Sequence, residues 1–485
     1  MTPCLLKEST VRDKLCGKMH QLGVLGLSIF AGVVFSLNVP ALAQPVASEP
    51  LPIEELRAFT EVFGRIKSDY VESVDDKKLI TQAIAGMLAG LDPHSAYLDK
   101  EEFREMQVGT RGEFGGLGIE VGMEDGFVKV ISPIDDSPAS RAGIKSGDLI
   151  VKLGDTFVKG MALSDAVKQM RGRPDTPITL TIARKGEDKP LVFTLKRAVI
   201  KIQSVKSTLI EPGYAYFRIT QFQEHTGETL ATAIQNLYKQ NQGAMKGIVL
   251  DLRNDPGGLL DGAVAVSAAF LPKNALVVYT DGRTEDAKMR LTASPENYLH
   301  TGAQDYLSAL PPSIKDVPMV VLVNGGSASA SEIVAGALQD HHRAVIMGTQ
   351  TFGKASVQVI MPLGDGTAIK LTTARYYTPN GRSIQAKGIV PDIALDDGSA
   401  SDTGLKVREA DLSKHLINDR NQDQAPVAAV PTGNSFNFTP ASRPQGVDEK
   451  DLKPELGEVV AKSDYELGQA IAFLKSRSAA HASAN

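Results

Sequence analysis

The spacing of apolar residues differs from one part of the chain to the next. Between residues 51 and 105, apolar side chains recur every three or four positions, which is the spacing of amphipathic helices. The first stripe consists of Leu56, Phe59, Val62, Phe63 and Ile66. A second stripe covers residues 79–91 and stops before Pro93. The pattern predicts an N-terminal helical region over residues 44–105, whose apolar faces form either a core or a contact with another protein.

Residues 106–200 contain shorter apolar runs that are separated by turn residues. Runs of this length and spacing are typical of strands. The strand candidates are residues 118–121, 127–131, 149–153, 178–183 and 191–195. One short helix is expected at residues 164–171, with Ser164 as its N-cap. The sequence therefore predicts a small, mainly-β module in this part of the chain.

Residues 201–396 alternate between two kinds of apolar segment. Continuous apolar runs at 248–252, 319–323 and 344–347 are typical of strands buried on both faces. Helical patterns lie near 227–239, 259–270 and 330–339. This alternation predicts an α/β domain.

The remaining residues divide into two segments. Residues 397–447 are rich in Asp, Ser, Ala, Pro and Gln and have few large apolar side chains, so we expect a disordered or loosely attached linker. Residues 448–485 are expected to form a C-terminal helical tail. Its apolar positions are Tyr465, Leu467, Ile471, Phe473 and Leu474.

The N-terminus has the three parts of a secretory signal peptide, predicted at residues 1–43. A basic stretch precedes an apolar run at residues 22–39, and Ala41-Leu42-Ala43 is a small-x-small cleavage site. We therefore expect export to the periplasm, with an uncleaved inner-membrane anchor as the alternative because the apolar run is long. Both cysteines, Cys4 and Cys16, lie in this leader. A mature chain without cysteine excludes a disulfide framework and a thiol nucleophile.

Charge and motifs exclude several other functions. The net charge is −5 and there is no basic block, so nucleic acid is not an expected partner. The sequence has no HExxH motif, EF-hand-like loop or Walker A loop. We therefore expect no metal, no cofactor and no use of ATP.

Two segments carry candidate chemistry. The run 324–332 contains Ser327, Ser329 and Ser331 and leads into the helical pattern, while Lys354 precedes a strand-like run at 356–361. A serine at a helix N-terminus with a lysine base would fit this arrangement, since free N–H groups there suit a developing oxyanion. The lysine must be buried enough to become neutral.

Two other interpretations of these segments remain. Ser329 and Glu332 also fit a capping box that only starts the helix, and a nucleophile can occupy the same position. A Ser/His/Asp triad would need His341 or His342, but these follow at the far end of the predicted helix.

Motifs in a fixed order across residues 51–396 carry a family resemblance. They are Gly115-Gly116-Leu117-Gly118-Ile119, Asp251-Leu252-Arg253-Asn254, Pro256-Gly257-Gly258, residues 326–332, residues 351–354, Ala374-Arg375-Tyr376 and Gly388-Ile389-Val390-Pro391-Asp392. The chain resembles the bacterial carboxy-terminal processing peptidases, which are tail-specific serine proteases with a Ser/Lys dyad and a PDZ domain. The resemblance implies a PDZ domain at 106–200, inserted before a crotonase-like protease core at 201–396.

The resemblance also implies roles for individual residues. Ser329 would be the nucleophile, Lys354 the general base and Gln358 the residue that positions the lysine. An N–H of Gly257 or Gly258, together with that of Ala330, would form the oxyanion hole. A substrate carboxylate would bind the PDZ loop formed by Gly115, Gly116, Leu117, Gly118 and Ile119.

One position departs from the family pattern. The family more often has Asn-Asn-Pro-Gly-Gly where this chain has Asn254-Asp255-Pro256-Gly257-Gly258. The additional acid near the site is expected to alter substrate preference.

The resulting hypothesis is an ATP-independent periplasmic serine endopeptidase that recognises the C-terminal regions of protein substrates. The resemblance implies a homo-oligomer and leaves a periplasmic adaptor protein open. Two alternatives are a non-catalytic PDZ scaffold with an inactive protease domain and a crotonase-type acyl enzyme. The second alternative should lack both the PDZ module and the signal peptide.

Overall fold

The computed structural model describes residues 51–134, 136–395, 407–420, 438–442, 459–461 and 463–483. The chain divides into two units between Leu79 and Ile80. The predicted signal peptide and most of the predicted linker lie outside the described residues. Within the described ranges, no helix is both long and apolar enough to cross a bilayer.

The first unit contains helix α2 (Ile53–Asp69) and the start of α3 (Asp76–Ala89). The predicted helical spacing is confirmed in α2. Its apolar stripe is not a core, however, because Leu56, Phe59 and Val62 are 47%, 47% and 57% exposed. Contact of this stripe with a second protein stays a prediction.

The predicted end of the helical segment before Pro93 is confirmed, and a short strand that the pattern did not predict follows it. After α3, Pro93 prevents the helix from continuing. The chain then forms strand β1 (Ala96–Leu98), which pairs with residues 368–370 of the core, before α4 (Lys100–Arg111) begins. Helix α4 crosses the predicted boundary between residues 105 and 106.

The core is a six-stranded sheet in the order β10, β11, β12, β15, β16, β19. The strands are β10 (Val205–Glu211), β11 (Tyr214–Ile219), β12 (Gly247–Asp251), β15 (Met319–Val323), β16 (Val345–Gly348) and β19 (Ile393–Ala394). All pairs except β10–β11 are parallel. The three strands predicted from continuous apolar runs are confirmed, with ends that differ by at most one residue.

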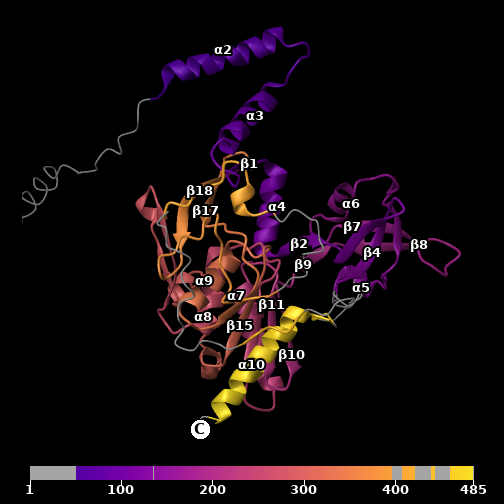
Figure 1. The fold of residues 1–485 in the computed structure, drawn as a ribbon. Helices are drawn as coiled ribbons and strands as arrows, with labels where there is room; N and C mark the ends of the chain where they lie inside the picture. Colours follow the sequence, from indigo (N-terminus) through magenta and orange to yellow (C-terminus); the bar gives the residue numbers. More distant parts are fainter. Residues whose placement is uncertain are drawn as a thin grey trace, which may run out of the picture. The chain divides into compact units, whose positions relative to one another are not determined.

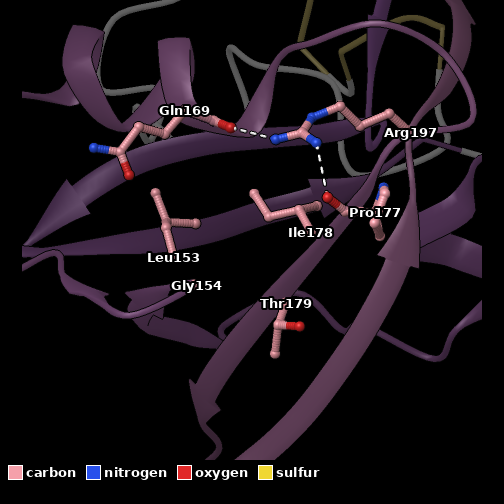
Figure 2. A pocket seen from close by; sticks show the side chains of 7 residues that line it. All are labelled: Leu153, Gly154, Gln169, Pro177, Ile178, Thr179 and Arg197. Carbon is pink, nitrogen blue, oxygen red and sulfur yellow. Dashed lines mark hydrogen bonds between the residues drawn. The ribbon is translucent and has the colours of Figure 1, made fainter.

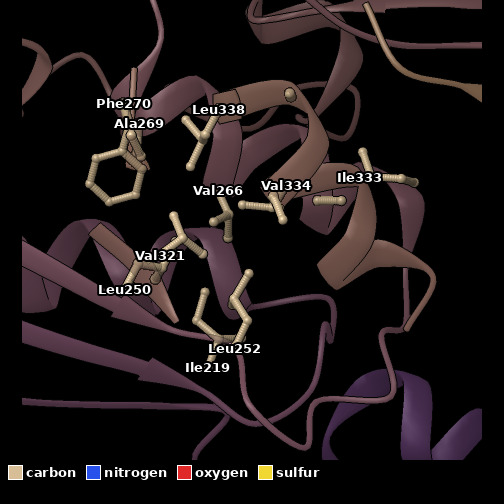
Figure 3. Close-up of a cluster of buried hydrophobic side chains, with 14 of the residues drawn as sticks. Ile219, Leu250, Leu252, Val266, Ala269, Phe270, Val321, Ile333, Val334 and Leu338 are labelled. Carbon is tan, nitrogen blue, oxygen red and sulfur yellow. The ribbon is translucent and has the colours of Figure 1, made fainter. Parts of the chain in front are cut away.

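Helices cover both faces of this sheet, which explains the continuous apolar runs. Side chains alternate between faces along each strand. Leu250 and Val321 belong to the cluster with α7 (Thr226–Gln240), α8 (Leu260–Phe270) and α9 (Ala330–Asp340) (Figures 1 and 3). Their neighbours Val249 and Val320 pack in the cluster with α10 (Tyr465–Ser483) on the other face.

A second sheet carries the strands that follow the candidate lysine. It runs in the order β1, β18, β13, β14, and β17 also pairs with β18. These strands are β17 (Ser356–Pro362), β18 (Ala368–Tyr377), β13 (Leu276–Gly282) and β14 (Arg290–Thr292).

The predicted mainly-β module is present between α4 and the core. Its sheet has the order β3, β4, β5, β7, β8, with β6 paired to β5. The elements are β3 (Ile119–Glu124), β4 (Phe127–Pro133), α5 (Pro138–Arg141), β5 (Leu149–Leu153), β6 (Thr156–Phe157), α6 (Leu163–Met170), β7 (Pro177–Ala183) and β8 (Leu191–Lys196). Ser164 is not the N-cap of α6, because the helix already starts at Leu163 and Ala162 takes that position.

The predicted architecture is confirmed: an α/β core, an inserted mainly-β module and N-terminal helices. The expectation of a loosely attached linker at 397–447 is wrong for residues 407–420. Glu409 in this segment is fully buried and Asn418 is 7% exposed. Composition did not reveal this packing because the segment is anchored by polar side chains rather than apolar ones.

Candidate active site

Ser329 lies at a sharp turn between β15 and α9. Its backbone has φ 55° and ψ −112°, a conformation that L-residues rarely adopt. A serine on a strained strand-to-helix turn presents its hydroxyl at the head of the helix, as in a nucleophile elbow. The small residues of this segment permit the turn, because a Cβ at position 326 would lie 3.0 Å from Asn254 Cα.

Glu332, in the first turn of α9, links the serine to the lysine loop. Its fully buried carboxylate accepts the N–H groups of Ser329 (2.8 Å), Gly353 (2.7 Å) and Lys354 (3.0 Å). It also accepts the Thr351 hydroxyl. Burial raises the pKa of Glu332 to about 7. The bond to Ser329 is the half of the predicted capping box in which the glutamate accepts, so Ser329 begins the helix as that interpretation expected.

Tyr376, on β18, provides a second link between the two residues. Its hydroxyl lies 3.1 Å from the carbonyl oxygen of Ser329 and also donates to that of Lys354. Tyr376 is 2% exposed, so this contact is inside the protein. Ser329 and Lys354 are therefore held near each other through their backbones.

Lys354 precedes β17, and its side chain is partly buried. Burial lowers the pKa of its ammonium group to about 8, which is the change a lysine base needs. Nζ donates to Gln358 Oε1 at 2.7 Å and to the Ser356 carbonyl at 3.3 Å. Within the described chain, no hydrogen bond joins Nζ directly to Ser329 Oγ.

Gln358 contacts Lys354 as the resemblance implied, and it is itself held in place. Its Nε2 donates to Ser356 Oγ (3.0 Å) and to Thr372 Oγ1 (3.1 Å). Thr372 Oγ1 donates in turn to Asp92 Oδ1 at 3.1 Å. This chain of contacts fixes the amide so that its oxygen faces the ammonium group.

The Pro256-Gly257-Gly258 turn lies against the head of α9. A Cβ added to Gly257 would lie 2.8 Å from the Ala330 nitrogen and 2.9 Å from Ser329 Cβ, so only glycine fits there. The N–H of Gly257 donates to Asp255 Oδ1 at 2.9 Å. Within the described chain, the N–H groups of Gly258 and Ala330 donate to no protein acceptor. Of the two candidate glycines, Gly258 is therefore the one whose N–H is not already bonded to a described protein acceptor.

Asp255 lies beneath this turn rather than facing a substrate. It is 0% exposed, and Oδ2 has no hydrogen-bond partner among the described residues. Burial raises its pKa to about 7. Asp255 therefore cannot contact a substrate directly, because its carboxylate is buried against the turn. The expected effect on substrate preference could arise only through the turn itself.

His341 and His342 lie at the other end of α9 and are exposed. The helix has 11 residues, which places that end about 16 Å from Ser329. His341 Nε2 contacts the Leu276 carbonyl instead. The arrangement does not support a Ser/His/Asp triad.

The predicted carboxylate-binding loop joins β2 (Glu113–Gly116) to β3. Strand β2 pairs with β9 (Ala198–Lys201), and Leu117 is buried. Gly118 has φ 71°, and a Cβ there would lie 2.2 Å from Ser137 Cβ. Its carbonyl accepts the Ser137 hydroxyl and the Ile134 N–H. These contacts fix the loop on its carbonyl side.

A separate hollow of about 420 Å³ lies elsewhere in the same module (Figure 2). It is lined by Leu153, Gly154, Gln169, Pro177, Ile178, Thr179 and Arg197. The guanidinium of Arg197 donates to the carbonyls of Gln169, Met170 and Pro177. Because these contacts occupy the cation, the hollow offers no free charge to a ligand.

Sequence reasoning missed several residues of this site. No pattern in the sequence indicates a role for Asp92, Thr372, Gln385 or Glu409, and Tyr376 stands out only as part of the Ala374-Arg375-Tyr376 motif. The Asp92-Pro93-His94-Ser95 turn carried the one local signal, since Asp and Ser often bond to nearby backbone groups in turns.

Comparison with known proteins gives matches to three parts of the chain. The family model for peptidase family S41 matches residues 213–395, and that for the PDZ domain matches residues 115–195. A third, the activating protease CtpB N-terminal domain, matches residues 36–102.

Individual relatives are similar over most of their length. A carboxy-terminal-processing protease of Bartonella bacilliformis is 45% identical over 406 residues, covering 82% of this chain and 90% of that protein. The carboxy-terminal processing protease CtpB of Bacillus subtilis is 34% identical over 437 residues, covering 88% and 85%. Among solved structures, a photosystem II D1 C-terminal processing protease is 32% identical, covers 70% of this chain and 86% of that one, and has a TM-score of 0.39.

Proposed function

This chain belongs to peptidase family S41, among the carboxy-terminal processing proteases, and from that premise we propose that it is an ATP-independent serine endopeptidase with a Ser/Lys dyad. The observation that carries the proposal is the pair of links between Ser329 and Lys354. Glu332 accepts both backbone N–H groups, and the Tyr376 hydroxyl contacts both carbonyl oxygens. A lysine that only carried surface charge would not need this arrangement.

In the proposed mechanism, Ser329 Oγ attacks the scissile carbonyl carbon. Neutral Lys354 accepts the hydroxyl proton and later gives it to the leaving amine. The neutral amine has two N–H groups, for Gln358 Oε1 and the Ser356 carbonyl, and a lone pair that can accept the Ser329 proton. The N–H groups of Gly258 and Ala330 stabilise the oxyanion. Water then releases the acyl group from Ser329.

We also propose how substrates reach this site. The PDZ domain would bind the substrate's C-terminal carboxylate at the loop from Gly115 to Ile119 and pair the peptide as an additional strand. The exposed stripe of α2 would contact a second copy in a homo-oligomer. The leader at residues 1–43 would direct the chain to the periplasm, where an adaptor protein is a further candidate partner.

Casein hydrolysis by Ser329→Ala and its neighbours tests the proposal. Ser329→Ala should lose all measurable activity and keep its fold, because only a half-buried hydroxyl is removed. Ser327→Ala and Ser331→Ala are matched controls. Their buried hydroxyls already donate to the carbonyls of Leu252 and Asp255, so these variants should lose about 1–2 kcal/mol of stability but keep activity.

Lys354→Arg completes the same experiment. Arginine keeps its proton, so this variant should be inactive over the whole pH range. Full activity in Ser329→Ala or Lys354→Arg would contradict the dyad. Inactivity of the unaltered protein towards casein and towards peptides of varied C-terminus would instead support the non-catalytic PDZ scaffold.

A further inference from the structure

The buried carboxylate of Glu409 lies outside the matched peptidase family region, which ends at residue 395. Glu409 begins a short 3-10 helix in the segment 407–420. We call this segment the C-terminal strap. The following contacts show that the strap meets the loop that carries Lys354.

Glu409 is linked to the lysine loop on both sides of Lys354, directly on one side and through Gln385 on the other. On the preceding side, its N–H donates to the Phe352 carbonyl at 3.2 Å. On the following side, its Oε1 accepts Gln385 Nε2 at 2.9 Å, and Gln385 Oε1 accepts the Ala355 N–H at 2.8 Å. Gln385 is fully buried, so this connection is shielded from solvent.

The second carboxylate oxygen of Glu409 faces His94. The distance from Oε2 to His94 Nε2 is 2.8 Å. His94 lies two residues after Asp92, and Asp92 Oδ1 accepts its backbone N–H. The same oxygen accepts the Thr372 hydroxyl, which in turn accepts from Gln358. The turn after α3 therefore reaches the base by two routes, one through Gln358 and one through Glu409.

The rest of the strap is anchored independently of Glu409. Asn418 Nδ2 donates to the carbonyls of Ser383 (3.1 Å) and Gln385 (2.9 Å). The Arg420 guanidinium lies 4.1 Å from the centre of the Tyr377 ring. Because these contacts hold the strap in place, removing the charge of Glu409 need not detach it.

Four charged groups act on Lys354 from the elements around it. Lys370 on β18 disfavours its ammonium form, whereas Glu409 on the strap, Glu332 on α9 and Asp92 after α3 favour it. His94 faces Glu409 and is the titratable group that would offset its charge. Of the three carboxylates, only Glu409 lies outside all three regions that family models match.

We propose that Glu409 is a positioning residue for the Lys354 base and that the C-terminal strap holds the lysine loop in its working geometry. The proposal rests on the proposed function, because it assigns Glu409 a role in proton transfer by Lys354. In this proposal the C-terminal strap holds the loop that carries Lys354 and is not merely a linker. The geometry that carries it is the set of contacts to Phe352, to Gln385 and to His94.

The test is the pH dependence of kcat/KM in Glu409→Gln. Glutamine can still accept from Gln385 and remain within hydrogen-bond distance of His94, but it lacks the negative charge. The pH at which activity rises, expected near 8 in the unaltered protein, should move down by about 0.5 to 1 unit. Asp411→Asn is the matched control, because it removes one charge from an exposed residue of the same strap and should leave the profile unchanged.

A second measurement does not depend on proteolysis. In Ser329→Ala background, the pH dependence of Lys354 labelling by an amine-reactive reagent, read by mass spectrometry, reports the neutral fraction of the lysine. The same downward shift in Glu409→Gln supports the proposal, even if the unaltered protein proves inactive and the proposed function fails. If the labelling midpoints of Lys354 are equal with and without Glu409→Gln, the proposal is wrong. A fall in Tm without a change in the midpoint contradicts it in the same way.

Discussion

Two buried carboxylates lie beside Ser329, and they differ in how well they are satisfied. Glu332 accepts hydrogen bonds from Ser329, Thr351, Gly353 and Lys354. Asp255 accepts one bond from Gly257 on Oδ1 and leaves Oδ2 without a partner among the described residues. Burial raises both pKa values to about 7. A neutral amide can therefore replace the carboxylate of Asp255, which accepts one hydrogen bond, but not that of Glu332, which accepts four.

Asp255→Asn should therefore stabilise the protein in a pH-dependent way. The folded-state pKa of Asp255 lies above its unfolded value of about 3.9, so its favourable contribution is complete at low pH and is lost as the pH rises to about 7. The variant does not titrate, and its gain in unfolding free energy should grow across this range to about 1–3 kcal/mol at pH 8. Urea denaturation at pH 4 and pH 8, in the Ser329→Ala background, measures it.

Glu332→Gln is the contrasting control for this experiment. Its amide NH₂ would replace an oxygen that accepts backbone N–H groups, so it should destabilise the protein at both pH values. A loss of stability in Asp255→Asn at pH 8 would show that the carboxylate has a partner that neutral asparagine cannot replace.

Residues close together in the sequence could be predicted, and residues far apart could not. Ser329, Lys354 and Gln358 occupy short motifs with recognisable spacing. Thr372 and Glu409 are isolated polar residues without a local signature, and their partners Asp92 and His94 are 280 and 315 positions away. Only the folded chain brings these pairs together.

At the scale of elements, buried charges join α10 to the segment that precedes the Pro256-Gly257-Gly258 turn. Arg253 directly precedes the turn 254–258 and is 8% exposed. It contacts Asp251 and Asp464, both at 2.6 Å, and also Glu466 in the first turn of α10. The apolar positions of the tail predicted this helix, but they gave no sign that its first turn binds the loop before Gly257.

Arg253→Leu should be strongly destabilising. It leaves three carboxylates without their shared cation, and breaking such a buried network costs about 3–5 kcal/mol. Activity should fall as well, because the turn that carries Gly257 and Gly258 loses its support. Lys475→Met is the matched control, since Lys475 joins α10 to Glu211 at 2.7 Å with side chains 48% and 44% exposed. Thermal unfolding should show a change below about 1 kcal/mol there; equal losses in the two variants would contradict the role of burial.

At the scale of the whole molecule, the PDZ domain and the peptidase region are separate parts of the chain. The family matches place the PDZ domain at 115–195, before the peptidase region at 213–395. We favour gating, in which binding of the substrate's C-terminus by the PDZ domain permits hydrolysis, because an unregulated protease would damage neighbouring proteins.

Amidation of a peptide substrate's C-terminus should lower kcat/KM about tenfold or more, because charge-assisted hydrogen bonds to the carboxylate are lost. The control is the same peptide with a free acid. Under gating, kcat stays low even at saturating amidated peptide. If saturation restores kcat, the PDZ domain contributes affinity alone. Equal hydrolysis of both peptides at every concentration would contradict the recognition of the carboxylate.

The positive φ of Ser329 decides which inactive variant is suited to trapping a bound substrate. A residue with a Cβ in that conformation stores about 1–3 kcal/mol of backbone strain, and glycine would release it. Ser329→Gly would thus lose the hydroxyl and also the backbone constraint, so the first turn of α9 could rearrange. Ser329→Ala keeps the Cβ and its backbone constraint, so it is the variant in which a trapped substrate would report the geometry of the working enzyme.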